Sequence, residues 1–297
     1  MSQPRQKTSD ATRHAPVPFT KMHGLGNDFV VLDLRNAAQG GARPIDGAAA
    51  RAIADRHRGV GCDQLIALEP PRGRDADIFM RIVNADGGEV TACGNASRCV
   101  ADLLFDELGR KKVVLETVAG LLTATRKADG NVCVDLGPAR HAWAEIPLAG
   151  AADTDDLPVE AGPLSHGVGV NIGNPHAVFF VARAEAIDLA AWGPKLEHDE
   201  LFPERANISV AQILGANCIR LRVWERGAGL TQACGTAACA AVVAAARTNR
   251  GARNATVRLD GGELEIAWRK DGHVEMTGPV ATSFTGTLSP SLFANGS

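Results

Sequence analysis

The chain has 297 residues, a net charge of −3 and 45% hydrophobic residues, which fits a globular protein long enough for two domains. This charge gives no footprint for nucleic acid or an anionic membrane, and no apolar run approaches the roughly 20 residues of a membrane span. The seven cysteines are an odd number, no two have Cys-x-x-Cys spacing, and the amino terminus lacks an apolar signal core. We therefore expect a cytoplasmic protein with reduced thiols, no disulfide scaffold and no metal site.

The first half of the chain predicts short strands joined by turns, followed by one main helix. Residues 1–16 are predicted to be a disordered tail. A short helix is predicted at 47–56, and the main helix runs from Ala96 to Leu108 and ends at Gly109. Strands are predicted at 18–23, 29–34, 65–68, 77–84, 113–117 and 131–136.

The second half repeats this plan after a domain boundary at Gly137-Pro138 and an acidic connecting loop at 149–158. A helix is predicted from Leu189 to His198, broken locally by Gly193-Pro194, and the Ala- and Val-rich run after Gly235 predicts the main helix. Strands are predicted at 168–172, 177–181, 206–213, 218–225, 257–260, 263–268 and 273–276. The pattern favours an α+β fold of two similar domains, 17–137 and 138–278, each a mixed sheet wrapped round a central helix. Segment 279–292 is expected to return and complete the first domain.

An internal duplication relates the two halves. Ala92-Cys93-Gly94 matches Ala233-Cys234-Gly235 at an offset of 234 − 93 = 141, and at the same offset Arg81 falls on Arg222. Each cysteine precedes a glycine at a helix start, where free N–H groups attract anions and are expected to lower the pKa of a thiol. Half-sites built alike usually face each other across a shared cleft. Two thiols opposed in this way indicate chemistry on both faces of a single carbon.

The alternative interpretation of any free cysteine is a small, buried hydrophobic residue. The equivalent positions of Cys93 and Cys234 at the two helix starts argue against it for this pair. Cys99 and Cys239 lie further along the same helices and are expected to belong to the core. The remaining three, Cys62, Cys133 and Cys218, are also interpreted as structural.

Polar residues at strand–turn junctions are the other candidates. Glu225-Arg226 offers a carboxylate for an ammonium group and a guanidinium for a carboxylate, the alternative being a surface ion pair. His176 is a candidate acid–base partner of a cysteine. Several asparagines offer the neutral donor and acceptor pairs that suit a zwitterion: Asn27, Asn84, Asn95, Asn174 and Asn207. No phosphate-binding loop or dinucleotide fingerprint is present in the sequence.

Six segments resemble the signature segments of the diaminopimelate epimerase family, in the family's order, from about Pro18 to Gly286. They are residues 22–29, 84–87, 92–95, 173–178, 225–227 and 232–236. The resemblance implies two mirrored domains with the active site in the cleft between them. It also implies cofactor-independent epimerisation of LL-2,6-diaminopimelate to the meso form, in lysine and peptidoglycan precursor biosynthesis, by a homodimer.

The resemblance also implies roles for individual residues. Cys93 and Cys234 form the acid–base pair, and His176 and Glu225 assist at the reacting centre. The backbone N–H groups of Gly94-Asn95 and Gly235-Thr236 hold the reacting carboxylate. The rest of the substrate is fixed by Asn27, Gln64, Asn84, Asn174, Asn207, Glu225 and Arg226. The sequence departs from the family pattern at Ala96 and Ala237, where glycine is frequent, and alanine is tolerated there if φ is negative.

Two other functions remain open at this point. The nearest is another isomerase of the same fold, of the proline racemase type, because the sequence does not reveal the size of the pocket. The second is a non-catalytic thiol protein, either a redox sensor or a metal binder. A catalytic role for the two cysteines can coexist with redox regulation. If Cys93 and Cys234 lie close together, oxidation to a disulfide between them would switch the enzyme off.

Overall fold

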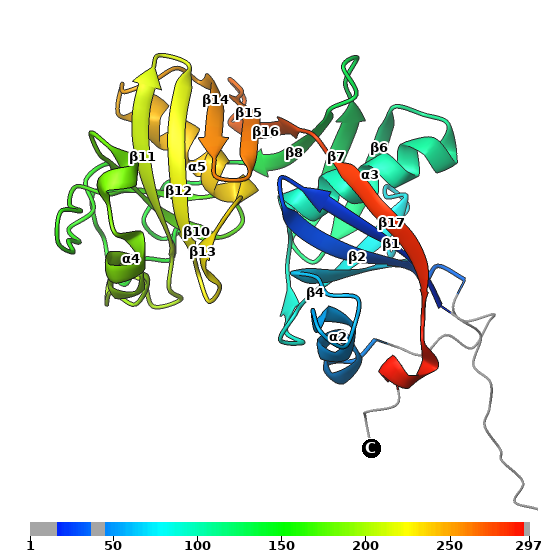
Figure 1. Cartoon of the computed structure of the whole chain (residues 1–297). Coiled ribbons are helices and arrows are strands. Elements are labelled where there is room, and N and C mark those ends of the chain that lie inside the picture. The colour runs from blue at the N-terminus through cyan, green and yellow to red at the C-terminus, as the bar shows by residue number, and fades with distance from the viewer. Residues whose placement is uncertain (1–16, 37–44, 294–297) are drawn as a thin grey trace, which may run out of the picture.

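The computed structural model describes residues 17–36 and 45–293, and the tail expected at residues 1–16 lies outside them. Two lobes stand side by side, one built mainly from the first half of the chain and one from the second (Figure 1). The first half contains β1 (Val17–Gly24), β2 (Asn27–Asp33), α2 (Gly47–Ala54), β3 (Gln64–Glu69), β4 (Ile78–Asn84), β5 (Glu89–Val90), α3 (Gly94–Leu108), β6 (Lys112–Thr117), β7 (Gly120–Arg126) and β8 (Val132–Pro138).

The second half has the same order of elements. It contains β9 (Val168–Asn171), β10 (Pro175–Phe180), η1 (Ala184–Ala186), α4 (Leu189–Glu197), β11 (Asn207–Gly215), β12 (Cys218–Glu225), β13 (Gly229–Thr231), α5 (Gly235–Arg247), β14 (Asn254–Leu259), β15 (Gly262–Trp268) and β16 (His273–Gly278). The last elements are β17 (Ala281–Leu288) and η2 (Pro290–Phe293).

Strand pairing confirms the duplication. In the first lobe β2–β3 and β4–β6 are parallel pairs, and β1–β2, β3–β4, β6–β7 and β7–β8 are antiparallel. The second lobe repeats each pair: β10–β11 and β12–β14 are parallel, and β9–β10, β11–β12, β14–β15 and β15–β16 are antiparallel. The expected α+β fold of two mixed sheets is therefore correct.

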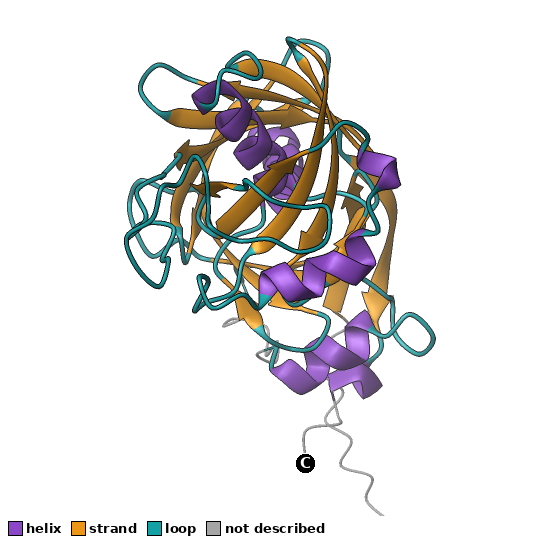
Figure 2. Ribbon diagram, turned by 90° about the vertical axis from the view of Figure 1, so that its left-hand side faces the viewer, coloured by secondary structure: helices purple, strands orange, loops and turns teal. Residues whose placement is uncertain are grey.

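Each main helix is enclosed by the strands of its own lobe, and Figure 2 shows the strands curving round the helices. Ten residues of α5 are buried, all of them Gly, Ala, Val or Cys, so the helix is thin enough for strands to approach from every side. The wider α3 buries Val100, Leu104 and Phe105 against its own sheet and ends at Gly109, which has a left-handed φ of 63°.

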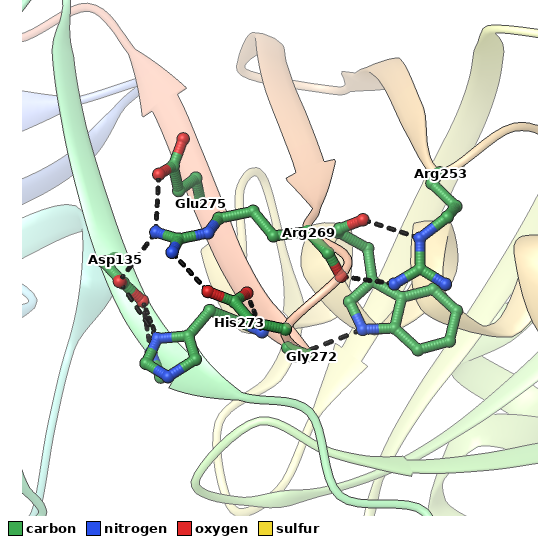
Figure 3. Close-up of polar contacts among 9 residues, drawn as sticks. Asp135, Arg253, Arg269, Gly272, His273 and Glu275 are labelled. Atoms are coloured by element: carbon green, nitrogen blue, oxygen red, sulfur yellow. Dashed lines mark hydrogen bonds and ion pairs between the residues drawn. The ribbon is translucent and has the colours of Figure 1, made fainter.

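The two lobes join where β8 pairs with β16, next to the proposed domain boundary at residues 137–138. Charged side chains reinforce this pairing (Figure 3). Arg269 contacts Glu275 at 3.1 Å, Asp135 at 3.5 Å and also Asp271, while His273 Nδ1 lies 2.9 Å from Asp135 Oδ1. These groups are partly exposed, so their contribution is mainly to orientation rather than stability.

The final strand returns to the first lobe, where β17 pairs antiparallel with β1 from Val17↔Leu288 to His23↔Ala281. Figure 1 shows this strand, in red, lying beside the blue β1. The chain therefore enters the second lobe and leaves it through neighbouring strands, β8 and β16.

Two expectations about local structure were wrong. Helix α4 is not broken at Gly193-Pro194 but runs unbroken to Glu197, because the proline removes only the one N–H that would bond to Ala190. Gly193 packs directly on Trp224, which holds the helix in place. Strand β7 was not predicted, although Leu122 and Ala124 alternate with more exposed neighbours as a half-buried strand requires.

The core of α3 gives a stability prediction. Leu104→Ala should lower the free energy of unfolding by about 2–5 kcal/mol, because Leu104 is 1% exposed and the truncation leaves a cavity. Leu108→Ala, one turn along the same helix at a residue that is 42% exposed, should cost about 0.5 kcal/mol or less. Urea denaturation measures both, and equal losses would contradict the packing described.

Candidate active site

The two predicted cysteines occupy equivalent positions. Cys93 is the N-cap residue of α3, with φ −147° and ψ 111°, and Cys234 is the N-cap residue of α5, with φ −127° and ψ 112°. In both lobes the chain leaves a strand, makes a short return strand and then enters the helix immediately after the cysteine. Each thiol is thus attached at the end of a helix that presents unpaired N–H groups.

The two helix starts lie together between the lobes. A Cβ on Gly94 would lie 2.8 Å from Met276 Cε, and a Cβ on Gly235 would lie 2.5 Å from Met276 Sδ. Both glycines therefore pack on one side chain of β16, and a larger residue at either position would displace the end of the Met276 side chain. Asn95 Nδ2 reaches across to the carbonyl oxygen of Ala233 at 3.4 Å. The structure thus brings the two cysteine-bearing helix starts side by side.

The thiols do not have the lowered pKa that their position at helix starts predicted. Burial raises the pKa of Cys93 to about 11, although the N–H groups of Ala96 and Asn95 act in the opposite direction. Burial also raises the pKa of Cys234 well above its ordinary value, and the hydroxyl of Thr236, 3.5 Å from its Sγ, opposes this. Desolvation outweighs the helix N–H groups here, so both thiols are protonated at neutral pH.

Glu225 lies near both cysteines, and its negative charge raises the pKa of each. Its Oε1 accepts a hydrogen bond from Thr231 Oγ1 at 2.5 Å. Burial raises the pKa of Glu225 itself, against the effect of that hydrogen bond. The structure therefore places the predicted carboxylate of the second lobe beside both cysteine-bearing helix starts.

His176 is fully buried and neutral. Its Nε2 lies 2.8 Å from Asn174 Oδ1, which assigns the ring proton to Nε2, and its buried Nδ1 has no partner within residues 17–36 and 45–293. Burial, together with the charge of Arg226, lowers its pKa to about 3. The ring therefore presents a hydrogen-bond acceptor and carries no charge at neutral pH.

The predicted residues of the first lobe form two hydrogen-bonded pairs. Asn95 Nδ2 donates to Asn27 Oδ1 at 3.2 Å, and Gln64 Nε2 donates to Asn84 Oδ1 at 2.9 Å. Asn95 Oδ1 is buried and has no partner in the described part of the chain. It therefore remains available as an acceptor beside the helix start.

Charged residues that sequence reasoning missed hold Asn27 in place. Asp63 Oδ2 accepts from Asn27 Nδ2 at 2.8 Å and from the N–H of Asp28 at 3.1 Å. Arg56 donates to both carboxylates, at 2.7 Å each. Burial disfavours the charged form of Asp28, but hydrogen bonds from Arg56 and Lys21 hold its pKa well below the ordinary value. The adjacency of Asp28 to Asn27 was the available signal in the sequence.

In the second lobe Asn207 and Arg226 are joined. Asn207 Oδ1 accepts the N–H of Arg226 at 2.9 Å, and Asn207 Nδ2 donates to the carbonyl oxygen of Pro175 at 3.0 Å. Glu197, 3% exposed and also missed from sequence, supports the same turn by accepting from Trp224 Nε1 at 2.7 Å and from the N–H of Gly227 at 2.9 Å. These hydrogen bonds therefore fix the turn that carries Glu225 and Arg226.

Comparison with known proteins identifies the family. A model of the diaminopimelate epimerase family matches residues 19–142 and 168–283. A diaminopimelate epimerase of Rhodospirillum centenum is 61% identical over 274 residues, 92% of this chain and 93% of the relative. One of Acidiphilium cryptum is 54% identical over 279 residues, 93% of this chain and 98% of the relative. The chain belongs to the diaminopimelate epimerase family.

Solved structures extend the likeness to the fold. A probable proline racemase from Agrobacterium radiobacter superimposes with a TM-score of 0.68 at 18% identity, covering 94% of both chains. A hydroxyproline epimerase from Agrobacterium vitis gives a TM-score of 0.65 at 17% identity, covering 93% of this chain and 94% of its own. These relatives share the two-lobed fold with the diaminopimelate epimerase family.

The two departures from the family pattern are accommodated. Ala96 and Ala237 are fully buried in the first turns of α3 and α5, and neither is among the described residues with positive φ. The added methyl groups therefore cause no backbone strain, as expected from the sequence.

The buried imidazole gives a pH prediction. His176 has a pKa of about 3 in the folded chain against 6.5 ordinarily, so only the unfolded chain takes up this proton as the pH falls from about 6.5 towards 3. Stability is thereby lost across that window. His176→Gln should lose less stability than the wild type between about pH 7.5 and about pH 5, as measured by urea midpoints at each pH. Equal losses would show that His176 already takes up a proton in the folded state.

Proposed function

We propose that this protein interconverts LL-2,6-diaminopimelate and meso-2,6-diaminopimelate without a cofactor, supplying lysine and peptidoglycan precursors. The observation that carries the proposal is the meeting of two equivalent helix starts, each capped by a cysteine, on Met276. The names of the close relatives supply the substrate.

Inversion at a carbon needs one base and one acid on opposite faces. In the proposed reaction one of Cys93 and Cys234, as thiolate, removes the α-proton, and the other, as thiol, donates a proton to the opposite face. The α-carbanion carries its charge into the adjacent carboxylate. N–H groups of Gly94-Asn95 and Gly235-Thr236 lie at the ends of two helices and stabilise that charge in a dry site.

The raised thiol pKa values fit a site that ionises only when a ligand is present. With Glu225 nearby, a thiolate at either cysteine is disfavoured by both burial and charge. A substrate ammonium group placed against Glu225 offsets that charge and favours the thiolate. The unpartnered Nδ1 of His176 accepts a second hydrogen from the same ammonium.

The other end of the substrate is a second amino acid group at the distal, non-reacting centre. We assign its carboxylate to Arg226, supported by Asn207, and its polar groups to Asn27, Gln64, Asn84 and Asn174. Asn207 Oδ1 accepts the backbone N–H of Arg226 and so fixes the turn that carries the guanidinium, and the Gln64–Asn84 hydrogen bond holds those two side chains together. Little order is therefore lost on binding.

We further propose that the enzyme acts as a homodimer in the cytoplasm. Phe284 on β17 is 49% exposed and provides an apolar contact on the outer strand of the first lobe. All seven cysteines are unpaired, which suits a reducing compartment. Among the described residues no helix is long and apolar enough to cross a bilayer. Sedimentation velocity should show a dimer for the wild type and a monomer for Phe284→Asp. A monomeric wild type would contradict the proposed dimer.

The activity is tested with purified, reduced protein, LL-diaminopimelate and no added cofactor, with the isomers separated by chiral chromatography. We expect meso-diaminopimelate to form until the two isomers reach equilibrium. Conversion of proline or hydroxyproline but not of diaminopimelate would show that the assigned substrate is wrong. Conversion of no amino acid would overturn the proposal.

The cysteine assignment makes a separate prediction. Cys93→Ala and Cys234→Ala should each lower kcat/KM for epimerisation by about 10²–10⁴-fold or more, because each removes one of two obligatory proton-transfer groups. Exchange of the α-proton on one face, or elimination from a substrate analogue, is expected to survive. Cys218→Ser, in a half-exposed thiol at the start of β12, is the matched control and should keep wild-type activity. Full activity in either alanine variant would sink the assignment.

A further inference from the structure

Arg98 is a buried positive charge that the mechanism above does not use. It lies in α3, just over one turn beyond Cys93, and is fully buried. Its Nη1 lies 3.3 Å from Met276 Sδ, while Nε and Nη2 have no hydrogen-bond partner within residues 17–36 and 45–293. A buried cation without a carboxylate partner costs free energy, so its presence calls for a reason.

Backbone encloses the guanidinium on two sides. A Cβ on Gly24 would lie 2.9 Å from Arg98 Nη2, and a Cβ on Gly278 would lie 3.5 Å from Arg98 Cζ and Nε. Both neighbouring positions are glycines, so neither offers a carboxylate to the guanidinium. The absence of side chains from β1 and β16 at these two points leaves the positive charge unneutralised.

Arg98 also lies near the residue that corresponds to it in the second lobe. At the offset of 141 residues it corresponds to Cys239 of α5, since 98 + 141 = 239. The charges of Arg98 and Cys239 act on each other, so Arg98 lies near its own counterpart. Its contact Met276 is the side chain on which both Gly94 and Gly235 pack. Arg98 therefore contacts the same side chain on which both helix starts pack.

The titratable groups that face Arg98 are thiols. They are Cys93 and Cys99 on its own helix and Cys239 on α5, and Arg98 lowers the pKa of each against the larger effect of burial. Glu225 is an anionic side chain whose charge raises the pKa of both Cys93 and Cys234. The charge of Arg98 thus opposes that of Glu225 at Cys93.

We propose that Arg98 is a positioning residue of the active site, whose fixed charge favours a thiolate and the carbanion at the starts of α3 and α5 without touching the substrate. This rests on the proposed epimerase function for its purpose, but the effect on the thiols does not depend on it. Guanidinium suits this task because it stays protonated even when buried.

The test compares Arg98→Met, which removes the charge, with Arg98→Lys, which keeps it. The rate of alkylation of Cys93 by iodoacetamide is followed against pH by mass spectrometry of the Cys93 peptide, without substrate. Arg98→Met should move the midpoint of this profile upward by about 1 pH unit. Arg98→Lys should remain closer to the wild type. The acidic limb of kcat/KM for diaminopimelate should move in the same direction.

Circular dichroism and urea denaturation establish that each variant is folded. An unchanged alkylation midpoint in folded Arg98→Met, with or without loss of activity, would show that Arg98 is only a packing residue and would overturn the proposal. Equal midpoints in the two variants would overturn it as well. If Arg98→Met does not fold, Arg98→Gln takes its place as the variant without the charge: an upward shift of its midpoint relative to Arg98→Lys supports the proposal, and an unchanged midpoint overturns it. Because alkylation needs no turnover, a failed diaminopimelate assay leaves this result intact.

Discussion

The contact of two helix starts with one methionine determines the arrangement of the site. Gly94 and Gly235 approach Met276 closely because neither has a side chain, and a larger residue at either position would displace the end of the Met276 side chain. Cys93 and Cys234 are fixed at these same points as N-cap residues, so the positions of the thiols follow from the packing of the two helix starts on Met276. A hydrogen bond from Asn95 Nδ2 to the carbonyl oxygen of Ala233 also connects the first lobe to the second.

Duplication explains how such a site arises, and its departures from symmetry show where the halves have specialised. Two copies of one strand–helix plan, joined through β8 and β16, place two similar thiols around one region. The counterparts differ in charge, however. Asn84 of the first lobe corresponds to Glu225 of the second, since 84 + 141 = 225, and Arg98 corresponds to Cys239. One lobe thus supplies the buried cation and the other the carboxylate, so the two thiols differ in environment although their backbones match.

The sequence predicted what depends on local pattern. The helix ending at Gly109, the cysteine pair and the mixed sheets follow from turn residues, periodicity and the repeat. The thiol pKa was predicted in the wrong direction because burial, which outweighs the helix N–H groups here, is a property of the folded chain. Arg56 binds Asp28, which is distant in sequence, and also Asp63, which is close. Glu197 accepts hydrogen bonds from Trp224 and Gly227, which are both distant in sequence. Such contacts leave no periodic signal.

The central claim is that two different thiols act on opposite faces of one carbon. The most direct measurement is the fate of the α-hydrogen when the reduced enzyme converts LL-diaminopimelate in deuterated water, analysed at low conversion. Two-sided chemistry predicts that newly formed meso product carries solvent deuterium at the inverted centre while unreacted substrate still carries hydrogen. Product that retains the substrate's own hydrogen would show that a single group serves both faces and would contradict the account.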